Sequence, residues 1–320
     1  MAHWNAQPLN ARDALERRKA FVKYINDDYE AEVFRIDGSQ TDQSGGPRLS
    51  VVIPTRDADR GGCFAALIEQ TQLQTMQAFE IIVVKGDPRQ GRAINTGAAA
   101  GCGNVILILD DDSRLGHERL FENLLAALDA PADIGMAGCP NIVPDDASPF
   151  VRKVMTSFPR KSSGLVDTIV DSDLADHGCA AFPRPAFEKV GGENELMPRG
   201  LDPYLRCELR KAGYRIVVVP DTWYHHLPPT SMRALLKQFY RNGKGSAYMQ
   251  KFHAHWTFDT PGEHGFDETV QHGLPYRVGR KLCHAVTALC RLDFLYVFAT
   301  VAYTAGYMVA YVFAGRDSRL

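Results

Sequence analysis

The stretch Val105-Ile106-Leu107-Ile108-Leu109-Asp110-Asp111-Asp112 decides the fold of this chain. Five successive aliphatic residues are typical of a strand buried on both faces, and three carboxylates follow it directly. Ligands of open α/β sheets bind beyond the carboxyl ends of the strands. Adjacent carboxylates repel one another unless a positive charge lies among them, and a divalent cation that arrives with a phosphate meets that need. The triplet alone also fits an acidic turn that caps the next helix.

Strands and helices alternate around this stretch. The pattern predicts strands that begin at residue 49 and span residues 79–84 and 105–109, with helices over residues 63–74 and 91–101. This order predicts a parallel sheet with right-handed crossovers. Neither a GxGxxG nor a Walker A sequence follows the first strand, which disfavours the usual dinucleotide and P-loop folds.

The totals restrict the class of protein. A chain of 320 residues that is 45% hydrophobic and 23% charged is long and apolar enough for one large α/β domain or two smaller ones. A formal net charge of -2 lacks the basic excess of a nucleic-acid-binding protein, so we expect no nucleic-acid partner. Seven dispersed cysteines without a CxxC pair favour a reducing compartment over a disulfide framework or a zinc site. The N-terminus lacks the apolar core of a signal peptide, which predicts a cytosolic catalytic domain.

A series of motifs resembles the family 2 glycosyltransferases, which have the GT-A fold. In the nucleotide-sugar half these motifs are Val-Ile-Pro-Thr-Arg at 52–56, Glu-Ile-Ile-Val-Val at 80–84, Arg-Ala-Ile-Asn-Thr-Gly at 92–97 and Leu-Asp-Asp-Asp at 109–112. In the acceptor half they are His-Gly-Cys-Ala-Ala-Phe at 177–182, Val-Gly-Gly at 190–192, Leu-Asp-Pro-Tyr-Leu-Arg at 201–206, Ala-Gly-Tyr-Arg-Ile at 212–216 and Val-Pro-Asp at 219–221. Each motif alone is loose, and the resemblance rests on their order and spacing over residues 49–245.

The resemblance implies a GT-A-like, Rossmann-type α/β fold with a mostly parallel sheet flanked by helices and a C-terminal helical or transmembrane segment. We expect an N-terminal extension over residues 1–48 and a glycosyltransferase domain over residues 49–245. Its nucleotide-sugar half covers residues 49–115 and its acceptor half residues 116–245. A linker or amphipathic region over residues 246–292 and a transmembrane or membrane-associated helix over residues 293–315 follow.

The resemblance also implies a reaction, the inverting transfer of a sugar from a nucleoside diphosphate to an acceptor hydroxyl. The departing diphosphate needs a divalent cation, Mn²⁺ or Mg²⁺, for which Asp112 is the expected ligand. Asp110 contacts the ribose or the metal, with Asp111 between the two. Asp202 matches the general base of the family. On the residues alone, an N-cap with Pro203 at the first helical position is the favoured interpretation of Asp202, and a carboxylate can serve both roles.

Further residues are assigned to the site by position. His226 fits a metal- or phosphate-contacting histidine slightly better than His225 does, and a structural histidine is the alternative. Arg92 contacts the diphosphate or is a solvated helix residue. The remaining residues expected around the base and ribose are Pro54, Thr55, Arg56 and Asp87.

Two motifs depart from the family pattern. The second strand ends in Lys85-Gly86-Asp87 where the family has an aspartate that binds the nucleobase, so this contact is moved to Asp87 or lost. The acidic pair before the acceptor helix is reduced to Leu201-Asp202, which leaves the expected base in place.

The C-terminal third carries cations and an apolar helix. Arg241 and Lys244 follow an amphipathic helix predicted at residues 231–240 and suit closure over the diphosphate, as in membrane-bound relatives; a basic helix end is the alternative. Residues 251–276 form a loop over the acceptor site or a linker.

Residues 294–314 have no charge and are long enough to cross a hydrocarbon core of roughly 30 Å. The flanking cations are Arg277, Arg280, Lys281 and Arg291 before the helix, and Arg316 and Arg319 after it. Their excess before the helix predicts a catalytic domain on the cytoplasmic side of a membrane. A helix at an oligomer interface, or one that lies along the membrane surface with residues 283–292, fits the same pattern.

The expected function is therefore a metal-dependent, inverting glycosyltransferase at a membrane, with a nucleotide-sugar donor and a lipid-linked or glycan acceptor. A nucleotidyltransferase of similar fold is one alternative, although its Gly-rich phosphate loop is poorly represented by residues 55–62. A non-catalytic nucleotide-sugar-binding or scaffold protein is the other, and the presence of Asp202 argues against it.

Overall fold

A computed structural model describes residues 4–27, 31–38, 46–129, 133–158, 161–259, 263–265 and 273–315. Its centre is a nine-stranded sheet in the order β1-β2-β4-β3-β5-β9-β7-β10-β8. The strands are β1 (Gln7–Leu9), β2 (Glu32–Asp37), β3 (Leu49–Thr55), β4 (Phe79–Lys85), β5 (Val105–Leu109), β7 (Ile134–Gly138), β8 (Val170–Asp171), β9 (Cys179–Pro183) and β10 (Arg215–Val218). A separate two-stranded sheet pairs β6 (Ser113–Leu115) with β11 (Tyr224–His226).

The large sheet is mostly parallel in direction. The pairings give β1, β4, β3, β5, β7 and β10 one direction, and β2, β9 and β8 the opposite one. All five residues of β5 are buried, as the aliphatic run predicts. Pro54 is accommodated in β3 because the pairing with β5 ends at Val52, so no ladder bond to β5 is lost there. The predicted α/β fold is confirmed.

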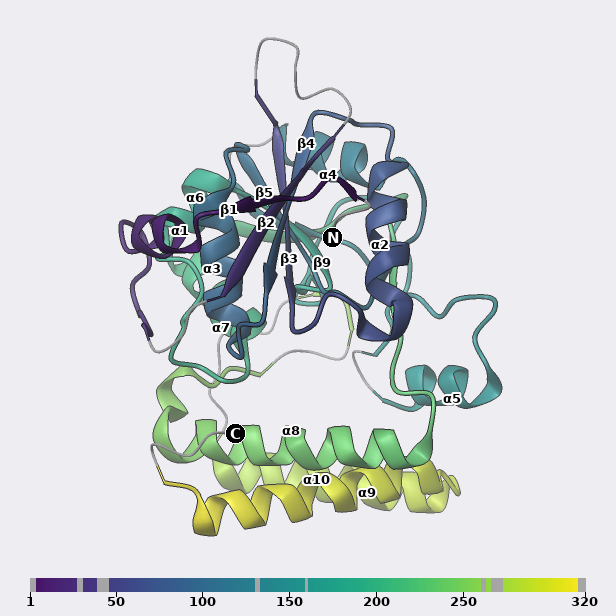
Figure 1. Cartoon of the computed structure of the whole chain (residues 1–320). Helices are drawn as coiled ribbons and strands as arrows, with labels where there is room; N and C mark the ends of the chain where they lie inside the picture. The colour runs from purple at the N-terminus through teal and green to yellow at the C-terminus, as the bar shows by residue number, and fades with distance from the viewer. Residues whose placement is uncertain are drawn as a thin grey trace.

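Helices cover both faces of the sheet (Figure 1). On one face, α2 (Cys63–Gln72) and α4 (Leu120–Asp129) pack against β3, β4 and β5. On the other lie α1 (Ala11–Arg18), α3 (Gln90–Ala100), α6 (Arg184–Lys189) and α7 (Leu201–Lys211). The small residues of α3 allow close packing, because a Cβ at Gly97 would overlap the Val52 side chain.

The sheet begins earlier in the chain than the sequence analysis predicts. β2 pairs antiparallel with β4 along six residues, and β1 pairs with β2. α1 ends at Arg18, whose fully buried guanidinium contacts Glu195 at 2.8 Å. In β2 only Val33 and Ile36 are buried, with two half-buried residues between them, so the strand lacks the strict alternation by which sequence would reveal it.

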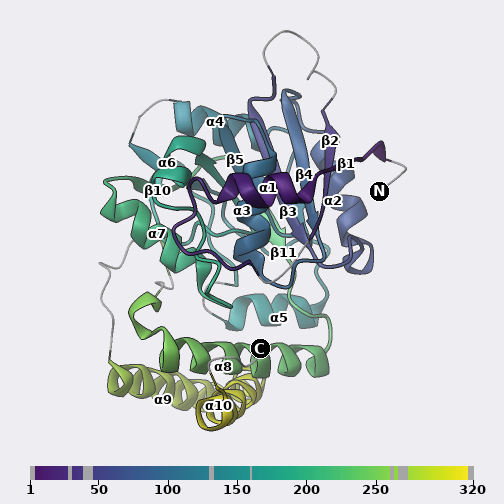
Figure 2. The ribbon, with the colours of Figure 1, turned by 60° about the vertical axis from the view of Figure 1, so that its left-hand side comes forward.

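Three helices form a layer beneath the carboxyl ends of the central strands: α8 (Met232–Phe252), α9 (Leu274–Cys290) and α10 (Phe294–Phe313) (Figure 1). The predicted helix at residues 231–240 is the first half of α8, and α9 occupies much of the predicted linker. Figure 2 shows α5 (Pro149–Ser157) above α8, where its Val154 packs with Leu235 and Ala299. Two 3₁₀ turns, η2 (Arg60–Gly62) and η3 (Ala254–Trp256), complete the described elements.

Paired glycines let α8 and α10 approach closely. A Cβ at Gly243 would overlap the carbonyl oxygen of Tyr303, and one at Gly306 would overlap that of Tyr240. Such contact between helix backbones is possible only where the side chain is absent. The predicted C-terminal helix is thus confirmed as a helix, and it lies along α8.

Within the described residues, α10 alone is long and apolar enough to cross a membrane, and 17% of its most apolar window is buried. Large apolar side chains are exposed on α10 and on α9, among them Phe298, Val301, Met308, Leu282 and Val286. Arg316 and Arg319 lie outside the described residues, as do the side chains of Arg277 and Lys281, so the predicted sidedness remains a prediction.

Candidate active site

The acidic triplet meets His226 at the end of β5. β6 follows the triplet directly and pairs antiparallel with β11, which places His226 opposite Ser113 and beside Asp112. One ligand atom each from Asp110, Asp112 and His226 lies within 4.8 Å of the others, the one such group of three among the described residues. Carboxylate oxygens and an imidazole nitrogen are suitable ligands for Mn²⁺. The residues present therefore fit the predicted divalent cation.

Asp112 contacts two cationic side chains. Its Oδ1 lies 3.1 Å from Nε2 of His226, and its Oδ2 accepts hydrogen bonds from Arg60 Nε at 3.0 Å and Nη2 at 2.6 Å. Asp111 accepts a bond of 2.7 Å from the hydroxyl of Thr55, at the end of β3. Gln90, at the start of α3, donates to Asp110 Oδ1 at 2.8 Å. The partners of the triplet thus come from the end of β3, the 3₁₀ turn that follows it, the start of α3 and β11.

The titration of the cluster follows from burial and these partners. Burial raises the pKa of Asp110 to about 6. Burial would also raise the pKa of Asp112, but the hydrogen bond and charge of His226, with the charge of Arg60, hold it well below its usual range. Burial would lower the pKa of His226, whereas Asp112 raises it to about 9. The site thus combines an ionised carboxylate with a protonated imidazole that a metal ion would have to deprotonate.

Asp202 lies in the first turn of α7 and is bound by His177. The backbone N–H of His177 donates to Asp202 Oδ1 at 2.7 Å, and the ring Nδ1 lies 3.2 Å from the same oxygen. Burial would raise the pKa of Asp202, but the charges of His177 and Arg206 lower it below its usual range. The N-cap of α7 is Gly200, so the alternative of Asp202 as N-cap is wrong.

Arg92 and Asp87, both predicted to contact the nucleotide, contact each other. Arg92 Nε and Nη2 donate to the two carboxylate oxygens of Asp87 at 2.8 and 2.9 Å, and both side chains are at most 1% exposed. Arg92 Nη1 also donates to Asn26 Oδ1 at 2.8 Å. The alternative of Arg92 as a solvated helix residue is wrong. The contacts of this pair with a nucleotide remain predictions.

The other predicted residues come from the end of β3, from α8 and from β11. Pro54 and Thr55 end β3, and Arg56 is exposed just beyond them. Arg241 is exposed on α8, and the neighbouring Asn242 accepts a hydrogen bond of 2.7 Å from Arg199 in the loop before α7. His225 Nδ1 lies 2.7 Å from the Ile142 carbonyl oxygen, whereas His226 contacts Asp112. The structure therefore favours His226 over His225 as the metal-contacting histidine.

Sequence reasoning missed four residues at this site: Arg60, Gln90, His177 and Glu193. Arg60 lies in a turn with positive φ at Ala58, Arg60, Gly61 and Gly62. The two adjacent glycines are a local sequence signal for such a turn, although not for the contact of Arg60 with Asp112. His177 opens a motif that the resemblance used, without a role being assigned to it. Gln90 and Glu193 carry no local signal, because each reaches the site only through the tertiary fold.

Comparison with known proteins agrees with this geometry. The family described as "Glycosyl transferase family group 2" matches residues 105–315, a span that contains the acidic triplet, Asp202 and His226. A search of curated proteins found no match. Among solved structures, the mannosyltransferase PcManGT from Pyrobaculum calidifontis, in complex with GDP-Man and Mn²⁺, is similar with a TM-score of 0.52. The two are 16% identical, over 94% of this chain and 93% of that chain, so this likeness shows the GT-A fold alone. Because the family match covers more than half of the sequence, the chain belongs to glycosyl transferase family group 2 and is a glycosyltransferase.

Proposed function

We propose that this glycosyltransferase moves a sugar from a nucleoside-diphosphate sugar to an acceptor hydroxyl, with inversion at the anomeric carbon. The observation that carries the proposal is the geometry that links the two groups of carboxylates. Leu109, directly before the triplet, pairs with Cys179 of β9, and the Ser113 hydroxyl donates to the Gly178 carbonyl oxygen at 2.6 Å. The adjacent His177 donates its backbone N–H to Asp202 Oδ1 at 2.7 Å. These contacts support one site that contains both the metal-ligand cluster and the expected base.

Asp110, Asp112 and His226 are the residues proposed to hold Mn²⁺ or Mg²⁺. When bound, a divalent cation supplies positive charge to the departing diphosphate. Thr55 orients Asp111 beside this position, and Pro54, Arg56, Asp87, Arg92 and Arg241 remain proposed donor contacts. The mannosyltransferase of similar fold that binds GDP-Man and Mn²⁺ supports this donor class.

Asp202 is the proposed general base. A pKa held below the usual range keeps the carboxylate ionised at neutral pH, so it can accept the proton of the acceptor hydroxyl. The acceptor oxygen bonds to the anomeric carbon while the bond from that carbon to the diphosphate breaks, and the attack comes from the face opposite the leaving group. A single displacement of this kind inverts the configuration.

Replacement of Asp202 by asparagine tests the assignment, because the amide keeps the shape of the side chain but accepts no proton. Turnover of the donor should fall by about 10²- to 10⁴-fold, the usual contribution of a general base. The donor dissociation constant, measured by calorimetry over a panel of UDP-, GDP- and dTDP-sugars with Mn²⁺, should change little. Asp146→Asn is the matched control, because Asp146 pairs with Arg114 on the surface. Undiminished turnover in Asp202→Asn, or a product of retained configuration, would exclude the mechanism.

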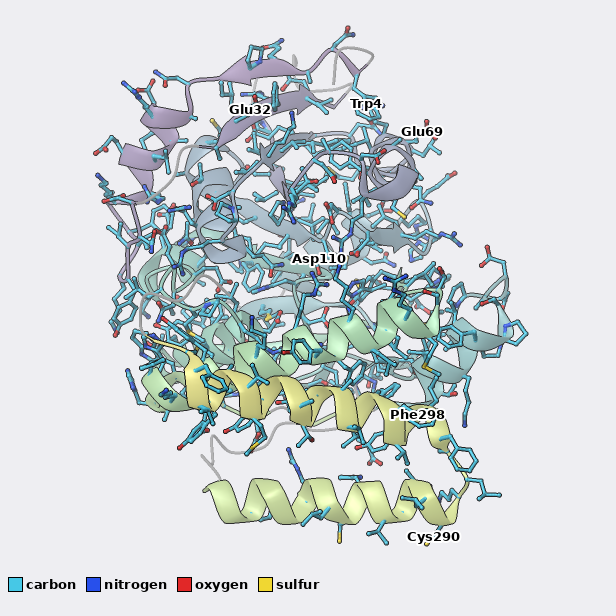
Figure 3. The ribbon with its side chains drawn as sticks, turned by 60° about the horizontal axis from the view of Figure 1, so that its bottom comes forward. Trp4, Glu32, Glu69, Asp110, Cys290 and Phe298 are labelled. Atoms are coloured by element: carbon cyan, nitrogen blue, oxygen red, sulfur yellow. The ribbon has the colours of Figure 1, made fainter. Side chains whose placement is uncertain are left out.

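The acceptor is proposed to be a lipid-linked sugar or a glycan presented at the cytoplasmic face of a membrane. In Figure 3, Asp110 lies at the face of the sheet domain that borders α8, and Phe298 lies on α10 in the same layer. Phe298 is 53% exposed and Phe313 is 82% exposed. An apolar surface next to the site suits contact with a membrane, as a spanning or a surface helix.

A further inference from the structure

His177 lies between two carboxylates that come from different elements. Its Nδ1 is 3.2 Å from Asp202 Oδ1 on α7, and its Nε2 is 2.9 Å from Glu193 Oε1 in the loop after α6. The imidazole is 3% exposed and the Glu193 side chain is 0% exposed. The three side chains form a continuous row that begins in the interior and ends at the proposed base.

The backbone of Glu193 is fixed from the other half of the domain. Asn95 of α3 donates to the Glu193 carbonyl oxygen at 2.9 Å and accepts from its N–H at 2.8 Å. The preceding Gly192 has φ +60°, and a Cβ there would meet the Asn95 amide oxygen at 2.6 Å. The loop thus makes a left-handed turn that only glycine adopts without strain, and it presents Glu193 to His177.

The carboxylate of Glu193 has no other partner to explain its burial. Among the described residues neither oxygen of Glu193 accepts a hydrogen bond, and the contact of Oε1 with His177 Nε2 at 2.9 Å is an ion pair. A buried carboxylate is costly unless a cation stands beside it. An apolar residue of similar size would fill this position at lower cost, so the carboxylate indicates a requirement for positive charge on His177.

We propose that Glu193 and His177 are positioning residues for Asp202: Glu193 keeps His177 cationic, and His177 holds Oδ1 of Asp202 so that Oδ2 takes the proton of the acceptor hydroxyl. This inference rests on the proposed role of Asp202. His177 keeps both of its protons throughout, and the proton of the acceptor passes to Asp202 and then to solvent.

Other charges face this row from each element packed against it. Arg206 lies on α7, Asp110 follows β5, and Asp176 precedes His177 and is bound by the Tyr224 hydroxyl from β11. Despite burial, which lowers it, the pKa of His177 is raised to about 10 by Asp202 and Glu193. Loss of the Glu193 charge therefore lowers the pKa of His177. A weaker cation beside Asp202 in turn raises the pKa of the base.

Glu193→Gln tests the proposal because it removes one charge and little volume. We expect kcat to fall about 10- to 100-fold, by analogy with the outer-shell residues that orient metal ligands. The KM for the donor should stay within about twofold, because Glu193 does not contribute to donor binding. Its loss raises only the free energy of the transition state. The pH range of kcat should narrow from both sides, with its alkaline limb at lower pH and its acid limb at higher pH. Glu188→Gln is the control, a change of the same charge on α6 at a side chain that is 39% exposed.

Glu193→Asp should have a higher kcat than Glu193→Gln, because it keeps the negative charge. If Glu193 only filled space, the shorter aspartate would be no better than glutamine. NMR of histidine-labelled wild-type protein gives a test that needs no stable Glu193 variant. The resonance of His177 is identified as the one that is absent from His177→Gln. It should show a protonated imidazole above about pH 8, well past the ordinary histidine pKa of about 6.5. An unchanged pH profile in Glu193→Gln, or a His177 that titrates near its ordinary pKa, would overturn the inference. A failure of the proposed function is distinguishable, because then Asp202→Asn itself would keep full turnover.

Discussion

Binding of Mn²⁺ to this protein should weaken steeply as the pH falls, because the proposed ligands hold protons that the metal must displace. His226, with its pKa raised to about 9, is protonated at neutral pH and coordinates only after losing that proton. Asp110, with its pKa raised to about 6, is protonated in acid, which adds a second proton to the site. Both pKa values are raised, so both groups hold their protons at a higher pH than usual, and the metal competes less well as the pH falls.

The size of the change in Mn²⁺ affinity follows from the number of protons that the ion displaces. Between about pH 9 and pH 6 one proton leaves for each ion bound, so the affinity should fall about tenfold per pH unit, or roughly 100-fold from pH 8 to pH 6. Below about pH 6 the slope should approach two protons, or about 100-fold per unit. Arg60 adds competition for Asp112 that does not depend on pH in this range, because arginine stays charged.

Titration calorimetry with MnCl₂ checks this directly. The heat measured in buffers of different ionisation enthalpy gives the protons released, which should be close to one per ion at about pH 7.5. His226→Gln should bind the ion more weakly and lose the dependence between pH 6 and pH 9. Asp146→Asn, the surface control, should match the wild type. An affinity that is constant from pH 6 to pH 8, with no proton release, would refute the assignment of His226 as a ligand, and an affinity that stays constant below pH 6 would refute that of Asp110.

Three further changes have predictable outcomes. Gly243→Val should destabilise the packing of α8 on α10 by about 1–3 kcal/mol, as overpacking does, and Gly279→Val on exposed α9, where a Cβ meets nothing within 4 Å, is the control in thermal or urea unfolding. Glu195→Gln should cost about 1–3 kcal/mol in urea unfolding, because the buried Arg18 loses its buried ion-pair partner and keeps an ion pair with Asp27, whose side chain is 58% exposed; the exposed Glu69→Gln should stay within about 0.5 kcal/mol. The double change Phe298→Ser and Phe313→Ser should reduce co-flotation with lipid vesicles several-fold, and Leu73→Ser, at an exposed position that ends α2, should not; equal flotation of both would argue against membrane contact through α10.

The parts of the fold that sequence could predict are those whose signal is local. The β5 run and the carboxylates after it are adjacent in the chain, and the apolar stretch that forms α10 has no charge. The N-terminal strands were not predicted because β2 lacks a strict alternation of buried and exposed residues, and its few apolar residues stand among polar ones. The packing of α10 along α8 was not predicted, because it depends on close contact at Gly243 and Gly306. These glycines lie 63 residues apart, and nothing in the sequence indicates that they meet.

The same distinction holds within the site. His226 was assigned by resemblance, and its reason is the pairing of β11 with β6, which no local pattern reveals. Arg60 lies 52 residues before Asp112, and a lone arginine in a turn has many ordinary explanations. Asp87 and Arg92 were each assigned to the nucleotide from their own surroundings, and the tertiary structure adds that they bind one another.

The two halves of the site should respond differently to the metal. Asp112 and His226 are 17% and 30% exposed, and their charges are balanced by groups that a cation can replace, namely a proton on His226 and the movable side chain of Arg60. Asp202 is balanced instead by His177, whose second partner is sealed from solvent at 0% exposure. A cation cannot enter that row without separating a buried ion pair, which is strongly unfavourable. Metal binding should therefore change the protonation of the donor side while the base keeps its ionisation, so the enzyme can bind and release its donor without losing the base that the acceptor requires.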